Sequence, residues 1–227
     1  PSREGFEDYN RYCRNFLSLA YLNGNAPSIL IDRGTYTLIK IWALDKDLKP
    51  IWKWASEGEW ESYRGQGGHK IQAADVDGDG RDEVVFGSAC LDDDGTPMWT
   101  TGLGHPDCLY VNDHDPSRPG LEIYYGQEKR QEKYGVCMAD AKTGEIVWGY
   151  DGATTHVHGK GMAGDIVAAH PGIEFYATEK DGSQSWLYSA SGERIGSESI
   201  GGISPIALWW DADPYKEILV STRIFDY

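Results

Sequence analysis

The chain has 227 residues, which is enough for one or two domains with a sizeable hydrophobic core. Its 36 acidic residues outnumber its 21 basic residues, and the formal net charge of −15 argues against nucleic acid and anionic membranes as partners. No apolar run is long enough to span a bilayer. An acidic ligand would therefore bind only where bound cations reverse the local field.

The composition favours an all-β fold, because 28 glycines provide turns between segments that hold many of the 14 tyrosines and 9 tryptophans. The four cysteines show no CxxC spacing, so we expect buried thiols, with a disulfide as the alternative. They are Cys13, Cys90, Cys108 and Cys137.

Residues 1–15 form a lead-in segment that fits no repeat of the chain. If this segment is helical, one face carries an apolar group. Its members are Phe6, Tyr9, Tyr12, Cys13 and Phe16. The chain starts at Pro1 without a methionine or a signal peptide, and it stops at Tyr227 directly after a strand-like run. We therefore expect a piece of a longer protein, with blade-like repeats over residues 16–227.

The sequence AADVDGDGRDEVV at 73–85 has the carboxylate density of a calcium loop. An EF-hand would need a glutamate where Phe86 stands and a helix on each side, whereas KIQAA and VVFGS are typical of strands. We therefore predict a calcium loop between two strands. Its predicted ligands are the carboxylates of Asp75, Asp77, Asp79 and Glu83 and the carbonyl of Arg81. The alternative is an Asp-rich turn without metal.

Other segments repeat this order of strand, loop, glutamate and strand. They are VNDHDPSRPGLEI at 111–123, AGDIVAAHPGIEF at 163–175 and WWDADPYKEIL at 209–219, with an acid-poor version, AYLNGNAPSILI, at 20–31. Their candidate metal ligands are Asp113, Asp115, Glu122, Asp165, Glu174, Asp211, Asp213 and Glu217. Metal-free turns are again the alternative, most of all where Val167 replaces the second aspartate. A bound ion would stabilise the fold.

A turn before a tryptophan forms a second repeat. Its copies are ALDKDLKPIW at 43–52, CLDDDGTPMW at 90–99, MADAKTGEIVW at 138–148 and YSASGERI at 188–195. Trp52 precedes Trp99 by 47 residues, and Trp148 follows Trp99 by 49. The third copy is similar to the tryptophan-docking motif of quinoprotein propellers. Because the other copies depart from that motif, we interpret the third as a hairpin turn packed by Trp148.

A period of about 40–50 residues made of short strands is the signature of propeller blades. We therefore predict an all-β arc of about four to five propeller blades with Asp-rich calcium loops. Histidines precede the inner strands in the segments GQGGHK at 65–70, GLGHPD at 102–107 and HVHGKG at 156–161. Inner strands line the channel of a propeller, so His69, His105 and His158 should converge on one rim.

Further polar residues are candidates for the same rim. Asp107 and Lys160 lie beside the histidines, Glu128 ends a second strand, and Arg33 and Tyr36 stand in a matching early segment. Histidines with carboxylates can hold a metal, and a lysine can meet an anion. The alternative is that these side chains are merely solvated.

Six segments, in this order, resemble polysaccharide lyase family eleven, the rhamnogalacturonan lyases. They are AADVDGDGRDEVVFG, TTGLGHPDCLYVNDHDPSRPGLEIY, YGVCMADAKTGEIVWG, GKGMAGDI, LYSASGERIG and LWWDADPYKEIL. The resemblance runs from about Phe16 to Tyr227. It implies part of an eight-bladed propeller and a calcium-dependent enzyme that cleaves the rhamnose–galacturonate backbone of pectin by β-elimination.

The resemblance also implies roles for the rim. It places the metal of the cleft on His69, His105, Asp107 and Glu128. It makes Lys160 and His158 catalytic, and Lys160, Arg33 and Tyr36 contacts of the substrate. Lys160 stands where the family motif GRGMAADID has an arginine, and a lysine lacks the bidentate geometry of that arginine. We further expect Ca²⁺ as the cofactor, rhamnogalacturonan I as the partner, and a monomer that is secreted, periplasmic or on the cell surface.

Two alternatives stay open. A calcium-binding propeller without catalysis would bind carbohydrate or protein and create no new chain ends. A propeller lyase for another uronic acid polysaccharide would give unsaturated products from a different glycan.

Overall fold

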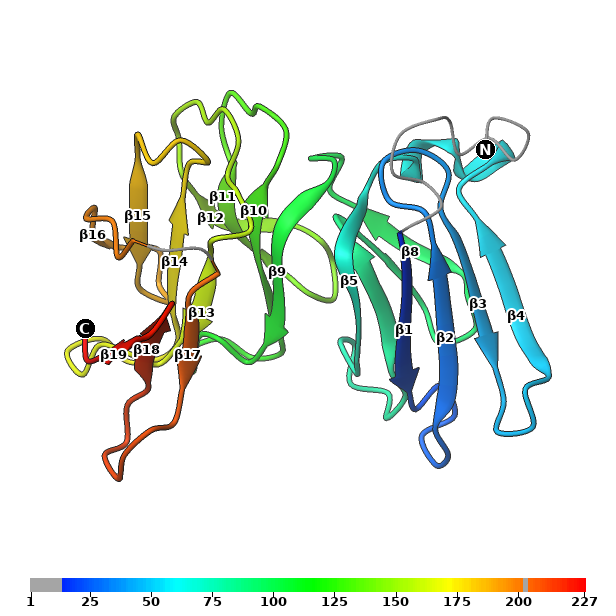
Figure 1. Cartoon of the computed structure of the whole chain (residues 1–227). Helices are drawn as coiled ribbons and strands as arrows, with labels where there is room; N and C mark the ends of the chain where they lie inside the picture. Colours follow the sequence, from blue (N-terminus) through cyan, green and yellow to red (C-terminus); the bar gives the residue numbers. More distant parts are fainter. Residues whose placement is uncertain (1–13, 202–203) are drawn as a thin grey trace.

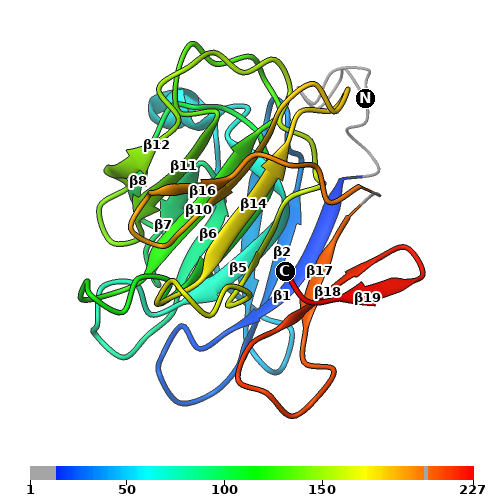
Figure 2. The same ribbon diagram turned by 90° about the vertical axis from the view of Figure 1, so that its left-hand side faces the viewer.

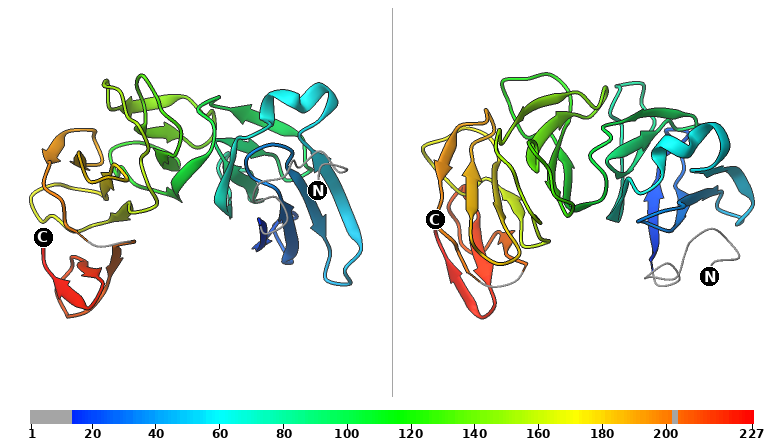
Figure 3. Two further views of the ribbon diagram at one scale, coloured as in Figure 1. Left: turned by 45° about the horizontal axis from the view of Figure 1, so that its top comes forward. Right: turned by 90° about the horizontal axis from the view of Figure 1, so that it is seen from above.

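The computed structural model describes residues 14–201 and 204–227, and these residues form β-strands almost throughout (Figure 1). The strands make five separate antiparallel sheets, four with four strands and one with three, so the predicted all-β fold is confirmed. Within the described ranges the sheets form an open arc and no closed propeller (Figure 3). No helix in these ranges has the length and apolar character needed to cross a membrane.

Each sheet is formed by strands that follow one another in the chain. The first sheet contains β1 (Asn15–Ala20), β2 (Ser28–Arg33), β3 (Lys40–Leu44) and β4 (Pro50–Ala55). The second contains β5 (Gly67–Ala74), β6 (Glu83–Gly87), β7 (Ala89–Leu91) and β8 (Pro97–Thr100). The third contains β9 (Pro106–Asn112), β10 (Glu122–Gln127), β11 (Val136–Asp140) and β12 (Ile146–Gly149).

The fourth sheet contains β13 (Met162–Gly164), β14 (Glu174–Thr178), β15 (Ser185–Tyr188) and β16 (Arg194–Gly196). The fifth contains β17 (Ile206–Leu208), β18 (Glu217–Val220) and β19 (Arg223–Phe225), and a 3₁₀ helix at Gly58–Tyr63 links the first two sheets. The first strand of the first sheet begins at Asn15. The predicted helical face at Phe6, Tyr9 and Tyr12 lies outside the described residues.

The second strand of each middle sheet is buried on both faces, which explains why EVVFG, EIYYGQ and EFYAT are continuously apolar rather than alternating. In β6, Phe86 packs toward the first sheet, and Val85 packs toward the third. In β10, Ile123 packs toward the second sheet, and Tyr124 stacks on Phe175 of the fourth at 4.4 Å between ring centroids. Each sheet therefore needs a neighbour on either side.

Three cysteines confirm the expectation of buried thiols. Cys90, Cys108 and Cys137 are free and buried in these cores between sheets, whereas Cys13 lies outside the described residues.

The first strands of successive sheets lie side by side on one side of the arc. β1 contacts β5, β5 contacts β9, and β13 contacts β17 (Figures 2 and 3). This arrangement brings the loops before β5, β9 and β13 toward one another, as the repeat predicted.

Strand register aligns the acidic loops, because the last residue of the first strand pairs with the loop glutamate in each of the last four sheets. Ala74 faces Glu83, and Leu208 faces Glu217. Counting on from these pairs, Trp209 occupies the place of Asp75. Asp211 therefore matches Asp77, the second aspartate of the first loop.

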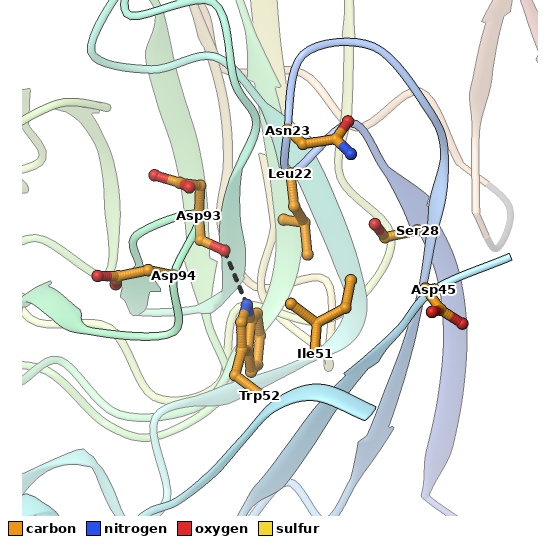
Figure 4. A pocket seen from close by; sticks show the side chains of 8 residues that line it. All are labelled: Leu22, Asn23, Ser28, Asp45, Ile51, Trp52, Asp93 and Asp94. Carbon is orange, nitrogen blue, oxygen red and sulfur yellow. Dashed lines mark hydrogen bonds between the residues drawn. The ribbon is translucent and has the colours of Figure 1, made fainter. Parts of the chain in front are cut away.

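Tryptophans connect neighbouring sheets in a repeated contact. The indole N–H of Trp52 donates to the carbonyl of Asp93 in the next sheet at 2.7 Å (Figure 4). Trp99 donates in the same way to Ala141 at 3.1 Å, and Trp148 donates to Ala190 at 2.9 Å. The interpretation that Trp148 packs its own hairpin turn was therefore wrong. That turn receives Trp99, and Trp148 contacts the following sheet.

A glycine in each receiving turn makes room for the indole. Gly144 has φ of +73°, and a Cβ added there would lie 2.6 Å from Cδ2 of Trp99. A Cβ added at Gly95 would lie 2.8 Å from Cδ2 of Trp52, and one added at Gly192 would lie 2.6 Å from Cγ of Trp148. The glycines are thus required both by the turn and by the close approach of the ring.

We expect Gly144→Ala to destabilise the chain more than Gly182→Ala does. Gly182 has a nearly equal φ of +74° but no neighbour within 4 Å of an added Cβ, so it reports the backbone cost alone. The collision with Trp99 should add about 1–3 kcal/mol to the loss of unfolding free energy. Denaturant titration measures both losses, and equal values would show that docking of the ring does not depend on this glycine.

Candidate metal centre and acidic loops

Three histidines and two carboxylates from the second, third and fourth sheets converge on one centre. His69 lies in β5, His105 and Asp107 lie at the start of β9, and Glu128 directly follows β10. His156 comes from the loop before β13. The predicted convergence of His69, His105, Asp107 and Glu128 is therefore found in the structure.

Asp107 is the common partner of the three imidazoles. Its Oδ1 lies 2.9 Å from Nε2 of His69 and 3.4 Å from Nε2 of His105, and its Oδ2 lies 3.4 Å from Nε2 of His156. Glu128 adds a second carboxylate, 3.2 Å from Nε2 of His105 and 3.9 Å from Nε2 of His156. Five side chains thus present nitrogen and oxygen atoms to a single small volume.

The hydrogen bonds of His105 make this cluster suitable for a cation. Its Nδ1 is hydrogen-bonded to the carbonyl of Gly67, which accepts only from N–H, so the proton of a neutral ring belongs on Nδ1. Nε2 then directs a lone pair toward Nε2 of His69, 3.1 Å away, and toward both carboxylates. Facing lone pairs require a positive charge between them, supplied by a proton or a metal ion. The donor set therefore fits a bound divalent cation.

Asp107 is prepared to remain ionised. Burial acts to raise the pKa of its carboxyl, but the interactions with the His105 and His69 imidazoles outweigh burial and hold the pKa well below its usual range. The backbone N–H of Gly159 also donates to Oδ2 at 3.0 Å. A permanent negative charge thus lies at the middle of the imidazoles.

His156 was not singled out by the sequence reasoning, which chose His158 from the same HVHGKG segment. Both side chains, together with Asp107, place ligand atoms within 4.8 Å of one another. His158 lies at the edge of the cluster, and the centroid of its ring is 5.6 Å from the ring centroid of His156. Two histidines separated by one residue offered no sequence signal to rank them.

A buried glutamate positions the loop that carries both histidines. Glu179 accepts the backbone N–H of Thr155 on Oε1 and that of His156 on Oε2, each at 2.7 Å. Glu179 is 5% exposed. Its two carboxylate oxygens therefore fix the backbone of the loop from a buried position beside the centre.

The other predicted rim residues surround the centre at different depths. The ring of Tyr36 lies 4.5 Å from that of His105, so Tyr36 forms part of the wall. Lys160 is partly buried and donates its ammonium to the carbonyl of Lys180 at 3.1 Å. Arg33 ends β2, and its side chain is also partly buried.

The first acidic loop forms a second candidate site. Asp75, Asp77 and Glu83 place carboxylate oxygens within 4.8 Å of one another. Oε2 of Glu83 accepts the N–H of Val76 at 2.7 Å, whereas the buried Oε1 has no partner among the described residues. An all-oxygen set with a free buried acceptor fits calcium.

The remaining predicted ligands of this loop have other contacts. Asp79 pairs with the guanidinium of Arg81, with Oδ2 2.9 Å from Nε, and Arg81 also reaches Asp93 at 2.9 Å. The structure adds Asp92 and Asp93 of the neighbouring turn, which group with Glu83 within 4.8 Å. Sequence reasoning assigned those two residues only to the hairpin turn.

The later loops are less complete. In the second loop, Arg118 places Nε 3.6 Å from Oε1 of Glu122, so a guanidinium stands beside that carboxylate. Asp115 accepts the hydroxyl of Ser117 at 2.7 Å, and Asp113 is exposed.

In the third loop, Glu174 has a buried Oε1 without a partner among the described residues, and Asp165 is partly buried. In the fourth loop, Asp211, Asp213 and Glu217 group within 4.8 Å, with both aspartates exposed.

Replacing Glu179 by glutamine should loosen the loop of His156. The amide nitrogen of glutamine is a hydrogen-bond donor and would face a backbone N–H that needs an acceptor. We therefore expect a loss of about 1–3 kcal/mol in unfolding free energy. Glu132→Gln is the control, because Glu132 forms an ion pair with Arg130 on the exposed surface. Denaturant titration of both variants makes the comparison, and equal stabilities would contradict the positioning role.

The chain is similar to known proteins over most or all of its length. Residues 4–227 match the family described as rhamnogalacturonan lyase family 11, C-terminal domain. The rhamnogalacturonan endolyase YesW of Bacillus subtilis is 42% identical over the whole chain, which spans 37% of the length of YesW. The exolyase YesX of the same species is 39% identical over 96% of the chain and 37% of YesX.

Solved structures show the same relationship. The rhamnogalacturonan lyase of Bacillus licheniformis superposes with a TM-score of 0.88 at 37% identity, covering 98% of this chain and 38% of that one. The YesW structure gives a TM-score of 0.86 at 41% identity, covering 96% and 37% of the two chains. The resemblance drawn from the six sequence segments is thereby confirmed, and the chain belongs to rhamnogalacturonan lyase family 11.

Proposed function

We propose that this chain is part of a calcium-dependent rhamnogalacturonan lyase that cleaves the rhamnose–galacturonate backbone by β-elimination. The observation that carries the proposal is the convergence of His69, His105 and Asp107 with Glu128 and His156 on one cation-ready centre. Membership of the family and the lyase names of its relatives support the reaction and the substrate class.

Elimination requires removal of the proton next to the uronate carboxylate. A divalent cation, when bound, neutralises that carboxylate and makes the adjacent proton more acidic. His69, His105, Asp107 and Glu128 would hold the cation, and we propose calcium. The neighbouring C–H electrons then form the double bond, the bond to O4 breaks, and the O4-linked sugar leaves.

His158 and Lys160 are the proposed groups for proton transfer and carboxylate contact. Burial lowers the pKa of His158, as do the charges of His156, Lys160 and Lys180, while Asp107 acts to raise it. The net lowering keeps the imidazole neutral, and a neutral imidazole can accept a proton. Lys160 would orient the uronate, as would Arg33 and Tyr36 from the first sheet.

The chain spans 37% of the length of the two curated relatives, so the activity belongs to a larger protein. We propose that the five sheets are blades of an eight-bladed propeller whose other blades lie outside this sequence. Exposed apolar side chains at both ends of the arc support this. Leu17 is 72% exposed on the first sheet, and Trp210 is 67% exposed beside the fifth.

Further properties are proposed on the same basis. The partner would be rhamnogalacturonan I, and the enzyme would be a monomer that is secreted, periplasmic or on the cell surface. Calcium in the loop of Asp75 would serve the fold, because its site lies within one sheet and apart from the imidazoles.

The lyase assay tests the central claim. The full-length protein containing this chain should produce ultraviolet-absorbing unsaturated ends from rhamnogalacturonan I, and a chelator should abolish the reaction until calcium is restored. We expect His105→Ala to raise the calcium concentration for half-activity at least about tenfold, since a ligand of the centre is lost. His170→Ala, outside the centre, is the control.

Each alternative predicts a different outcome. Binding of the polysaccharide without new chain ends would favour a non-catalytic propeller. Unsaturated products from another uronic acid polymer alone would favour a different lyase specificity. Activity that returns with another divalent metal but not with calcium would reject calcium as the cofactor.

The first acidic loop yields a prediction about pH. Burial, and secondarily repulsion from Asp77, raises the pKa of Glu83 to about 7 in the folded chain from an ordinary value of 4.5. Protonated Glu83 therefore favours folding, and this contribution is present below pH 4.5 and is lost as the pH rises through about 7.

In a chelator, the melting temperature should thus fall between pH 5 and pH 8, and calcium should reduce the fall. Glu83→Gln should flatten the chelator profile. An unchanged slope in that variant would assign the fall to the general negative charge instead.

A further inference from the structure

A cavity of about 260 Å³ continues from the metal centre along the first strands of the second and third sheets. His69 and Asp107 of the centre form one part of its wall. Lys70 and Tyr110 form another part. A ligand that reaches the centre can therefore extend into a space that also contains a cationic side chain.

The ammonium of Lys70 is held in place without a carboxylate. Its Nζ lies 4.0 Å from the centroid of the Tyr110 ring, and in the part of the chain that the structure describes it makes no ion pair. This is unexpected in a chain with 36 acidic and 21 basic residues. A partly buried cation in such a chain would otherwise be expected beside an acid.

Tyr110 is itself fixed, so the position of Lys70 is prepared in advance. The Tyr110 hydroxyl donates to the carbonyl of Gly161 at 3.0 Å, and its ring stacks on that of Tyr124 with centroids 6.3 Å apart. One face of the ammonium rests on the ring, which leaves its other donors for a ligand.

We propose that Lys70 binds a uronate carboxylate of the polysaccharide in this cavity and so contributes to selection of an acidic glycan. This inference rests on the proposed function and adds a contact to it. A compact ammonium on an aromatic face can make a charge-assisted hydrogen bond to a carboxylate, and the loss of such a bond lowers affinity about tenfold or more.

The test uses the full-length protein with calcium and the disaccharide galacturonosyl-rhamnose. Its galacturonate carries no sugar on O4, so it binds without elimination. Calorimetry would compare the wild type, Lys70→Met and Lys70→Arg with this ligand and with its carboxyl-reduced form. Lys53→Met is a matched control, because Lys53 also lies 4.0 Å from an aromatic ring centroid, that of Trp42, on the outer strand β4.

We expect Lys70→Met to weaken binding of the acid about tenfold and to leave binding of the reduced ligand nearly unchanged. Lys70→Arg should recover part of the loss, and Lys53→Met should bind as the wild type does. Equal losses for both ligands would assign Lys70 to packing and overturn the proposal. Equal affinities of Lys70→Met and Lys53→Met would also overturn it. If the wild type neither binds the acid nor cleaves rhamnogalacturonan, the proposed function fails together with this inference.

Discussion

The structure depends on one constraint, which is that the second strand of each middle sheet has two apolar faces. Val85 and Phe86 point to opposite neighbours, as do Ile123 and Tyr124, so no sheet can bury its own surface alone. Stacking is therefore obligatory, and a tryptophan crosses each of the first three interfaces to a backbone carbonyl of the next sheet. The stacking of the sheets fixes the positions of the loops at the inner edge. The candidate metal centre is formed by residues at this edge of the second, third and fourth sheets.

The loop glutamates show how the fold and the proposed metal binding would share one residue. In each of the last four sheets, Oε2 of this glutamate accepts backbone N–H groups of the loop, so the residue is required whether or not an ion is present. Only the other oxygen is available for a cation. The aspartates that would complete a site can therefore vary between sheets without disrupting the turn. This explains why Arg118 stands beside Glu122, whereas the Oε1 of Glu83 is left free.

The period of the repeats was visible in the sequence because the first four sheets share one kind of turn and the last four share the loop glutamate. That period was sufficient to bring His69 and His105 to one rim before any coordinates were considered. It could not choose between His156 and His158, because the choice depends on how Glu179 holds their loop. The partner of Trp148 was missed for a similar reason. The Trp148 indole contacts Ala190 in the next repeat. The spacing of residues along the chain does not distinguish a contact between repeats from a contact within one repeat. The place of Trp209 in the fourth loop, where the first loop has an aspartate, follows only from strand register.

A chain with a net charge of −15 would be an unusual receptor for the proposed acidic polymer, and a cation at the candidate centre would resolve this conflict locally. The imidazoles around Asp107 lower the pKa of its carboxyl, so Asp107 offers a negative charge to a cation. Under the proposed function, that cation would reverse the local field where the polymer binds. Screening by salt acts less on such a partly buried group than on surface charges. Recognition of the acid would then depend on the metal, because without it the carboxylates of the protein and of the polymer would repel each other.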